Sequence, residues 1–440
     1  MRRSLLLTAL LLRAGTVDSG AHVDGVALAP GDDPLGWSHR PPLVQLLELP
    51  IPPDDVVVRA CAGDAHLVLL TRHGRVLTAG SNRYGQLGRS PDGSLPAEPA
   101  LGSGTHALVA REIEPTVRVP LAEFACGPIS TALIAEERVL TFGDNSNGQL
   151  GRATDASHMD RTPRPIDVGT RPARAADSAW QTLGVKVGVG APLLSPRFAL
   201  VSMSEFLGAA VTIDGELYLW GSEDGGGGGG VRAEWSPRQV RVPLHADETI
   251  VQLAVGSAHV LVRTSRGRIL SAGENDVGQL GRHAHEHEPL DAFAPLHLPF
   301  RAHAYVDVSS TELHAAALTA DGSVCTWGDD DALQLGRALG ERESTDGWAE
   351  RPGWVDMRPT LGHTADGAER IVSVSAGRYH TVALTSGGGL IGWGSNEEGQ
   401  LGVQPLADAP ARDAERASTG ARPGGGGGGA RDGEGDARAR

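Results

Sequence analysis

Three histidines at alternate positions are the residues best suited to metal chemistry in this chain. His283, His285 and His287 are interleaved with Glu286 and Glu288. Alternate residues of a β-strand share one face, and imidazoles gathered on one face can ligate a metal ion. These histidines fall in a predicted inter-strand loop, however, where nothing fixes their geometry. We keep them as metal candidates and predict no bound metal and no cofactor.

Four further histidines recur at one position of a repeated segment, at His66, His259, His314 and His380. One histidine in each of four repeats cannot converge with the others as catalytic groups would. A structural hydrogen bond is therefore predicted for each. The sequence shows no nucleophile–base pair and no paired carboxylates in a supporting context. We predict no catalytic residue and no enzymatic activity.

A fixed spacing connects these histidines to glycines and to a glutamine. From each histidine the chain reaches one glycine after eight residues, a second after fourteen and a glutamine after twenty. The second glycine and the glutamine are Gly80 and Gln86, Gly273 and Gln279, Gly328 and Gln334, and Gly394 and Gln400. Each glutamine is followed by Leu-Gly. A phrase that recurs in constant register indicates a repeat architecture.

Two less regular copies bring the number of repeats to six. In one, Ser130 replaces the histidine, and a deletion of one residue brings Gly143 and Gln149 closer. In the other, Leu207 replaces the histidine and leads in step to Gly221, but the Gln-Leu-Gly phrase is lost in a run of six glycines. The repeats thus run through most of the chain.

Each repeat is predicted to contain four β-strands and to open at a proline-containing strand, from Pro41 onward, with residues 237–240 as an example. The last two strands are joined by Asp-Gly turns such as Asp214–Gly215, which tolerate positive φ. The fourth strand ends at an aromatic residue and a glycine, with Trp220, Trp327, Trp393 and Phe142 as the aromatic residues. So small a sheet cannot bury both faces alone, but radial stacking buries each face on the next sheet. The sequence predicts an all-β propeller of four-stranded antiparallel blades.

The unit at 380–402, His-Thr-Val-Ala-Leu-Thr-x₂-Gly-x₄-Trp-Gly-Ser-Asn-x₂-Gly-Gln-Leu-Gly, resembles the repeat of the regulator of chromosome condensation family. The resemblance covers about residues 40–405 and implies a seven-bladed propeller. We predict that both chain ends build the seventh, degenerate blade. Residues 24–36 would give a shortened fourth strand and residues 403–406 a proline strand. Six blades are the alternative if residues 1–21 are removed as a signal peptide.

The predicted organisation has three parts. Residues 1–36 are the degenerate blade segment or contain a signal peptide, since a leucine-rich run follows two arginines. Residues 37–410 form the propeller. Residues 411–440 are rich in Gly, Arg, Asp and Ala, and a disordered tail is predicted because almost no apolar side chain is present. No later segment is long and apolar enough to be transmembrane.

Charge and cysteine content limit the function. The net charge of −15 speaks against direct nucleic-acid binding, which needs clustered Lys and Arg. Cys61, Cys126 and Cys325 are an odd and sparse set. We expect them to be small buried core residues without a disulfide framework.

A non-enzymatic protein–protein interaction scaffold is the function that the repeats favour. The family resemblance implies a second hypothesis, a guanine-nucleotide exchange factor for a small GTPase. Ultraviolet sensing, as in plant photoreceptors of this family, is not predicted, because the tryptophan of their Gly-Trp-Arg-His-Thr motif is missing at 377–381. We expect a monomer that binds a protein partner, with a small GTPase as a candidate. The expected location is cytoplasmic or nuclear, or outside the cell if the first 21 residues are cleaved.

Overall fold

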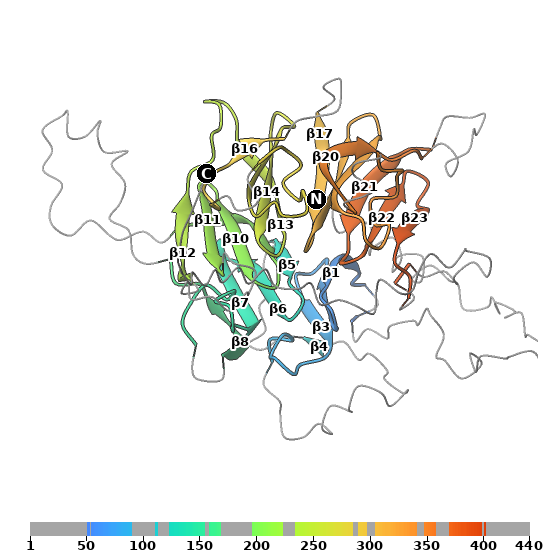
Figure 1. Cartoon of the computed structure of the whole chain (residues 1–440). Helices are drawn as coiled ribbons and strands as arrows, with labels where there is room; N and C mark the ends of the chain where they lie inside the picture. Colours follow the sequence, from blue (N-terminus) through green and yellow to red (C-terminus); the bar gives the residue numbers. More distant parts are fainter. Residues whose placement is uncertain are drawn as a thin grey trace, which may run out of the picture. The chain divides into compact units, whose positions relative to one another are not determined.

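The computed structural model contains strands and no helix in the part of the chain that it describes (Figure 1). The described residues are 51–52, 54–89, 111–112, 123–154, 158–168, 196–222, 234–284, 289–296, 304–340, 347–357, 369–397 and 400–401. All of them belong to one compact unit, Met1–Gly402.

The described strands form six antiparallel sheets, numbered here as blades 1 to 6 in chain order. Blade 1 contains β1 (Val57–Ala62), β2 (His66–Thr71), β3 (Val76–Gly80) and β4 (Arg111–Glu112). Blade 2 contains β5 (Phe124–Cys126), β6 (Ser130–Ala135), β7 (Arg138–Asp144) and β8 (Met159–Pro165). Blade 3 contains β9 (Phe198–Met203), β10 (Leu207–Thr212), β11 (Leu217–Gly221) and β12 (Glu234–Val240).

The second half of the chain continues the same pattern. Blade 4 contains β13 (Ile250–Val255), β14 (His259–Thr264), β15 (Ile269–Gly273) and β16 (Ala294–Pro295). Blade 5 contains β17 (Tyr305–Ser310), β18 (His314–Thr319), β19 (Val324–Asp329) and β20 (Trp348–Trp354). Blade 6 contains β21 (Ile371–Ala376), β22 (His380–Thr385) and β23 (Leu390–Gly394). In every blade the strands pair in chain order.

Consecutive blades meet along their first strands, so the sheets form a propeller. The contacts run from β1 to β5, β9, β13, β17 and β21 in turn. The all-β propeller predicted from the repeats is therefore confirmed. The described residues hold six blades instead of the expected seven. Segments 24–36 and 403–406, expected to build the seventh blade, lie outside the described residues.

The position of the proline strand corrects the predicted blade boundaries. Pro237 lies in β12, which pairs with β11 of the same blade, and β8 pairs with β7 in the same way. The proline strand thus closes a blade instead of opening the next one. An outermost strand leaves one edge unpaired, so a proline there removes no hydrogen bond from the ladder.

The histidine position and its glycine face each other across strands two and three of a blade. His66 pairs with Gly80, and His314 pairs with Gly328. Gly80 has a φ of 104°, and a Cβ there would lie 2.3 Å from the carbonyl oxygen of Ala65. Only glycine fits this backbone conformation and this close approach, which explains why it recurs fourteen residues after the histidine.

The core consists of apolar clusters between neighbouring blades. Trp220 of blade 3 packs with Ala132 and Ile134 of blade 2. Trp327 of blade 5 packs with Leu261 and Ile269 of blade 4. The aromatic residues at the ends of the third strands therefore fill the space between blades, as the repeats predict.

The cysteines depart from the expectation of three core thiols. Cys61 in β1 and Cys126 in β5 form a disulfide, whereas Cys325 is a buried free thiol. Although 65 residues separate the bonded pair, the first strands of neighbouring blades bring their Cα atoms to 5.8 Å. The ring creates this proximity, so cysteine spacing along the sequence gives no sign of it.

Candidate functional site

Three of the four repeated histidines connect their blade to the following one. The Nε2 atoms of His66 and His314 lie 3.0 Å from the Oγ1 atoms of Thr131 and Thr381, respectively. In the same way, His259 Nε2 lies 2.7 Å from Ser310 Oγ. All three hydroxyl groups belong to the following blade.

The hydroxyl partners define the tautomer of these histidines. Thr131 donates its own proton to the carbonyl oxygen of Gln86 at 3.1 Å, and Thr381 donates to that of Gln334 at 2.9 Å. A hydroxyl has one proton to donate, so the imidazole Nε2–H must be the donor to it. His66 and His314 thus each start a relay that ends on the glutamine of a Gln-Leu-Gly phrase, whereas Ser310, the partner of His259, donates to the carbonyl oxygen of His314 at 3.2 Å.

Burial keeps these histidines neutral. It lowers the pKa of His66 and of His259 to about 4, and that of His314 to about 3. A neutral, hydrogen-bonded imidazole at a blade interface has a structural role at neutral pH. His380 in β22 is only half-buried, and burial lowers its pKa as well.

The glutamines of the Gln-Leu-Gly phrases accept hydrogen bonds both from their own loop and from the following blade. Gln279 Oε1 accepts the backbone N–H of Val277 at 3.0 Å, and its carbonyl oxygen accepts the indole N–H of Trp327 at 3.0 Å. The carbonyl oxygens of Gln149 and Gln334 accept the indoles of Trp220 and Trp393 in the same way. The Gln-Leu-Gly phrase is therefore an inter-blade connector.

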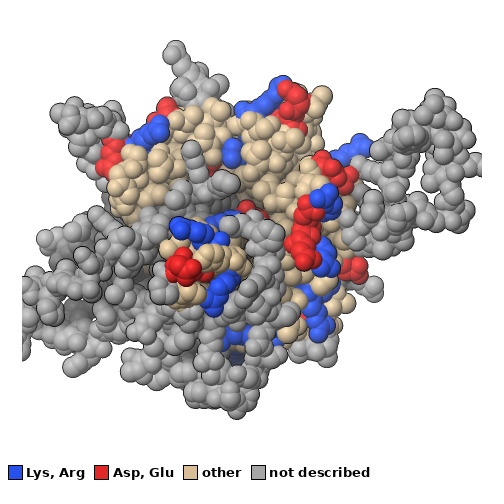
Figure 2. Space-filling model, turned by 180° about the vertical axis from the view of Figure 1, so that it is seen from behind, with Lys and Arg blue, Asp and Glu red and all other residues tan. Residues whose placement is uncertain are grey.

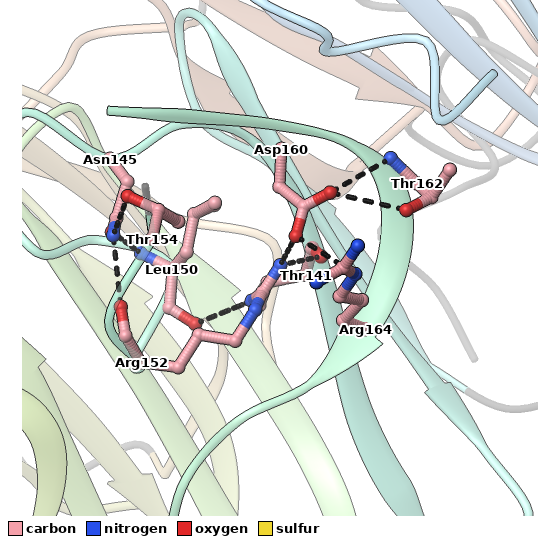
Figure 3. A network of polar contacts seen from close by, with 8 residues as sticks. All are labelled: Thr141, Asn145, Leu150, Arg152, Thr154, Asp160, Thr162 and Arg164. Atoms are coloured by element: carbon pink, nitrogen blue, oxygen red, sulfur yellow. Dashed lines mark hydrogen bonds and ion pairs between the residues drawn. The ribbon is translucent and has the colours of Figure 1, made fainter. Parts of the chain in front are cut away.

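An arginine directly after this phrase was missed by sequence reasoning, and Figure 3 shows its contacts in blade 2. Arg152 donates from Nη2 to Asp160 Oδ2 at 2.9 Å and to the carbonyl oxygen of Thr141 at 3.0 Å. The guanidinium thus connects the third strand of the blade to the fourth. Arg282 repeats part of this arrangement in blade 4, where it donates to Ser271 Oγ at 3.1 Å. The sequence could have indicated this position, because an arginine follows Gln-Leu-Gly in four repeats, at 89, 152, 282 and 337.

Of the histidine cluster at 283–287, only His283 lies among the described residues with its side chain. His283 is 82% exposed, and its Nδ1 lies 2.8 Å from Glu350 Oε1. His285 and His287 lie outside the described residues. Among the residues with described positions, no group of three or more metal-ligating side chains occurs.

Four charged residues, each in the turn between the first and second strands of a different blade, lie close to one another. We call Asp64, Glu205, Glu312 and Arg378 the axial charge cluster. Arg378 Nε lies 2.9 Å from Glu312 Oε2. Burial raises the pKa of Glu312, Arg378 lowers it, and Glu205 and Asp64 raise it further. Blades 1, 3, 5 and 6 therefore bring these groups within electrostatic reach of one another.

The cluster is suited to binding a cation. Burial is also the main cause that raises the pKa of Glu205, opposed by Arg378. One guanidinium faces three carboxyl groups, so an approaching cation would stabilise the ionised forms of both glutamates. Tyr379, next to Arg378, is 42% exposed and adds apolar area. Sequence reasoning did not bring these residues together, because each belongs to a different repeat.

Elsewhere on the described surface, charges of opposite sign lie next to each other. Figure 2 shows acidic and basic side chains side by side on one face of the molecule. Exposed ion pairs such as Arg266–Asp247, at 2.6 Å, are consistent with this mixture. Isolated surface pairs of this kind contribute little to stability and define no site.

Comparison with known proteins identifies the repeat. Models of the regulator of chromosome condensation (RCC1) repeat match residues 57–86, 250–279 and 371–400 and, with a second model, residues 321–384. The chain carries RCC1 repeats. Three of the matched segments begin at or next to the first strand of a blade and end at Gln86, Gln279 and Gln400.

The relatives differ from this chain in length and in sequence. Protein pim1 of Schizosaccharomyces pombe is 28% identical over 297 residues, which cover 66% of this chain and 49% of pim1. The chain thus spans about half the length of that relative. Human WBSCR16 has a TM-score of 0.58 at 20% identity, with 81% of this chain and 80% of that chain covered. Prp20p from Saccharomyces cerevisiae has a TM-score of 0.52 at 18% identity, with 78% and 70% covered. At these identities the two structures show the propeller fold alone.

The part of the chain that the structure describes contains no helix long and apolar enough to span a bilayer.

Proposed function

We propose that this RCC1-repeat chain is a non-enzymatic protein-interaction scaffold whose axial charge cluster contacts a positively charged segment of its partner. The convergence of Asp64, Glu205, Glu312 and Arg378 from four blades carries the proposal. The cluster has more carboxyl groups than guanidinium groups, which favours a segment rich in Lys or Arg. A rigid ring that presents turns at its axis is a common platform for binding.

The repeat positions themselves support a scaffold. The histidine side chains, the tryptophan indoles and the glutamine carbonyl oxygens make contacts that connect one blade to another. They are used within the ring and are not available to a substrate. Partner recognition would then depend on residues that differ between repeats, such as Glu205, Glu312 and Arg378 at equivalent turns.

A guanine-nucleotide exchange factor for a small GTPase is the second candidate. It is favoured by the family resemblance and by the likeness to Prp20p, a protein whose structure was described together with its binding to Gsp1p and histones. An exchange factor would use one propeller face to displace contacts to the nucleotide. This activity is compatible with the same axial cluster.

The experiment compares partner capture by three forms of the full chain. They are the native protein, Glu205→Lys/Glu312→Lys, and Glu136→Lys as a control at a side chain that is 76% exposed. We expect one set of partners on the native and control proteins, and its loss from the double variant. Equal capture by all three forms would contradict a role for the axial cluster.

A nucleotide-release assay separates the two candidate functions. Any GTPase recovered by the native protein is loaded with labelled GDP and mixed with each form. Faster release with the native protein and not with the double variant would establish the exchange factor and displace the scaffold. Release that stays at the intrinsic rate, with binding retained, supports the scaffold.

A further inference from the structure

The disulfide between blades 1 and 2 lies beside one of the turns that carry the axial charge cluster. Cys61 is the next-to-last residue of β1, and Cys126 is the last residue of β5. Both are only partly buried, so a small thiol can approach the bridge. Directly after the two strands, the backbone N–H of Asp64 donates to the carbonyl oxygen of Pro128 at 3.0 Å. The bridge therefore holds together the two strand ends from which these turns begin.

The two turns are packed tightly against each other. A Cβ on Gly63 would lie 2.4 Å from the carbonyl oxygen of Gly127. Since closely packed groups transmit a displacement instead of absorbing it, a change in the separation of β1 and β5 at this end moves the turns as well. The position of Asp64 thus depends on the bridge.

Another pair of blades shows what joins these positions where no disulfide is present. Cys61 lies five residues before the histidine position of blade 1, and Cys126 lies four before that of blade 2. The same positions of blades 5 and 6 hold Ser309 and Ala376, and there the backbone N–H of Ala376 donates to Ser309 Oγ at 3.0 Å. A thiol is a weaker donor and acceptor than a hydroxyl, so reduction replaces a covalent bond with at most a weak contact.

Other contacts keep blades 1 and 2 together when the bridge is reduced. Arg59 Nη2 lies 2.5 Å from Glu123 Oε1 further along the same two strands. His66 Nε2 contacts Thr131 Oγ1 at 3.0 Å, and apolar side chains of both blades form a common cluster. Reduction is therefore expected to loosen one end of the junction and to leave the blades folded.

Asp64 connects this junction to the axial charge cluster. Its charge contributes to the raised pKa of Glu205 and of Glu312, so it lies within electrostatic reach of both. The side chain is exposed, and its turn, rather than surrounding packing, sets its place. Three carboxyl groups face the single guanidinium of Arg378, so displacement of one carboxyl group reduces the negative excess that attracts a cation.

We propose that the Cys61–Cys126 bridge is a redox control of the axial charge cluster. The oxidised chain holds Asp64 in the cluster and binds a Lys- or Arg-rich segment more tightly than the reduced chain does. The inference rests on the proposed function of that cluster. The reductant is a thiol such as glutathione: one thiolate attacks a sulfur of the bridge, and a second releases the mixed disulfide. Two electrons and two protons pass to the cysteines, and the two reductant molecules leave as their own disulfide.

Binding of a labelled octa-arginine peptide to the oxidised and the reduced full chain tests the proposal. We expect the dissociation constant to rise about fivefold or more on reduction, which is the lower end of the usual coupling between two sites. Equal affinity in the two states would overturn the redox control and leave the proposed function standing, whereas no affinity in either state would overturn both. A reduced chain that is unfolded by circular dichroism would show that the bridge serves stability alone.

Two cysteine variants identify the source of the change. Cys61→Ser/Cys126→Ser should bind the peptide as the reduced native chain does and should not respond to reductant. Cys325→Ala retains the bridge and should respond as the native chain does. A response to reductant that persists in the double variant would assign the effect to another group and overturn the proposal.

Hydrogen exchange provides a readout that does not depend on the peptide. We expect the amide of Asp64 to exchange at least about tenfold faster after reduction, because its hydrogen bond to Pro128 opens more often. The matched control is the amide of Ser257, which makes the same contact with the carbonyl oxygen of Glu312 between blades 4 and 5, at 3.5 Å. It should exchange equally in both states. An unchanged rate at Asp64 would show that the bridge does not set the turn and would overturn the proposal.

Discussion

The indole Nε1 of Trp327 donates a hydrogen bond to the carbonyl oxygen of Gln279 in the preceding blade, at 3.0 Å. Trp327 is fully buried, so this carbonyl has no access to water if the indole is removed. We expect Trp327→Phe to destabilise the protein by about 1–3 kcal/mol, because a buried acceptor is left unsatisfied. Thermal melting measures the loss. Trp354→Phe, at a side chain that is 39% exposed, is the control and should melt close to the native protein.

Asp307 is expected to be the most sensitive acidic residue for stability. It lies in β17, where Oδ1 accepts Gln252 Nε2 of blade 4 at 2.7 Å and Oδ2 accepts Ser373 Oγ of blade 6 at 2.7 Å. Asp307→Ala removes the carboxylate through which blade 5 binds blades 4 and 6. We expect the free energy of unfolding to fall by about 3 kcal/mol or more. Denaturant unfolding of this variant beside Asp214→Ala, in an exposed turn, measures the difference. Similar midpoints for the two variants would show that Asp307 does not hold the blades together.

The neutral histidines predict a loss of stability in mild acid. Their pKa values are lowered in the folded protein to about 4 for His66 and His259, and to about 3 for His314. Their contribution is therefore complete above pH about 6.5 and is lost as the pH falls toward those values, since the unfolded chain binds the protons first. Each histidine contributes a slope of up to about 1.4 kcal/mol per pH unit.

The substitution His314→Gln tests this origin of the pH dependence. Glutamine keeps a donor but does not titrate, so the melting temperature of the variant should fall less between pH 7 and pH 5. Asp329 acts in the opposite direction, because burial raises its pKa to about 6 and its protonation favours the folded state. An unchanged slope in the variant would exclude His314 as a source of the acid sensitivity.

The disulfide between Cys61 and Cys126 predicts a simple thiol count. Unfolded without reductant, the protein should react with one equivalent of a thiol reagent, at Cys325, and with three after reduction. Cys61→Ser/Cys126→Ser should lower the stability by about 4 kcal/mol, if loop-closure entropy over 65 residues is the main effect. In a reducing environment the same interface relies on contacts such as Arg59–Glu123, at 2.5 Å. Three reactive thiols without reductant would contradict the bridge.

The repeat spacing was enough to predict the propeller, because histidine, glycine and glutamine recur where the ring needs the same contact. The proline strand was placed at the wrong end of the blade, because a strand's position along the chain does not say which neighbour it pairs with. The pairing of β12 with β11 decides that question.

The axial charge cluster and the disulfide could not be predicted for a related reason. Glu205 and Glu312 come from alternate blades, and Cys61 and Cys126 come from adjacent ones. The packing of the blades around one axis brings each set together, and no single repeat contains more than one member. The arginine at 152 is different, since it recurs after Gln-Leu-Gly in four repeats and was visible in the sequence.

The contacts of the tryptophans have a direction along the chain. Trp220, Trp327 and Trp393 donate to Gln149, Gln279 and Gln334, which are always earlier residues. During synthesis, each glutamine therefore leaves the ribosome before the tryptophan that binds it. The propeller can grow one blade at a time from its N-terminal side, with every new blade docking on a surface that is already in place.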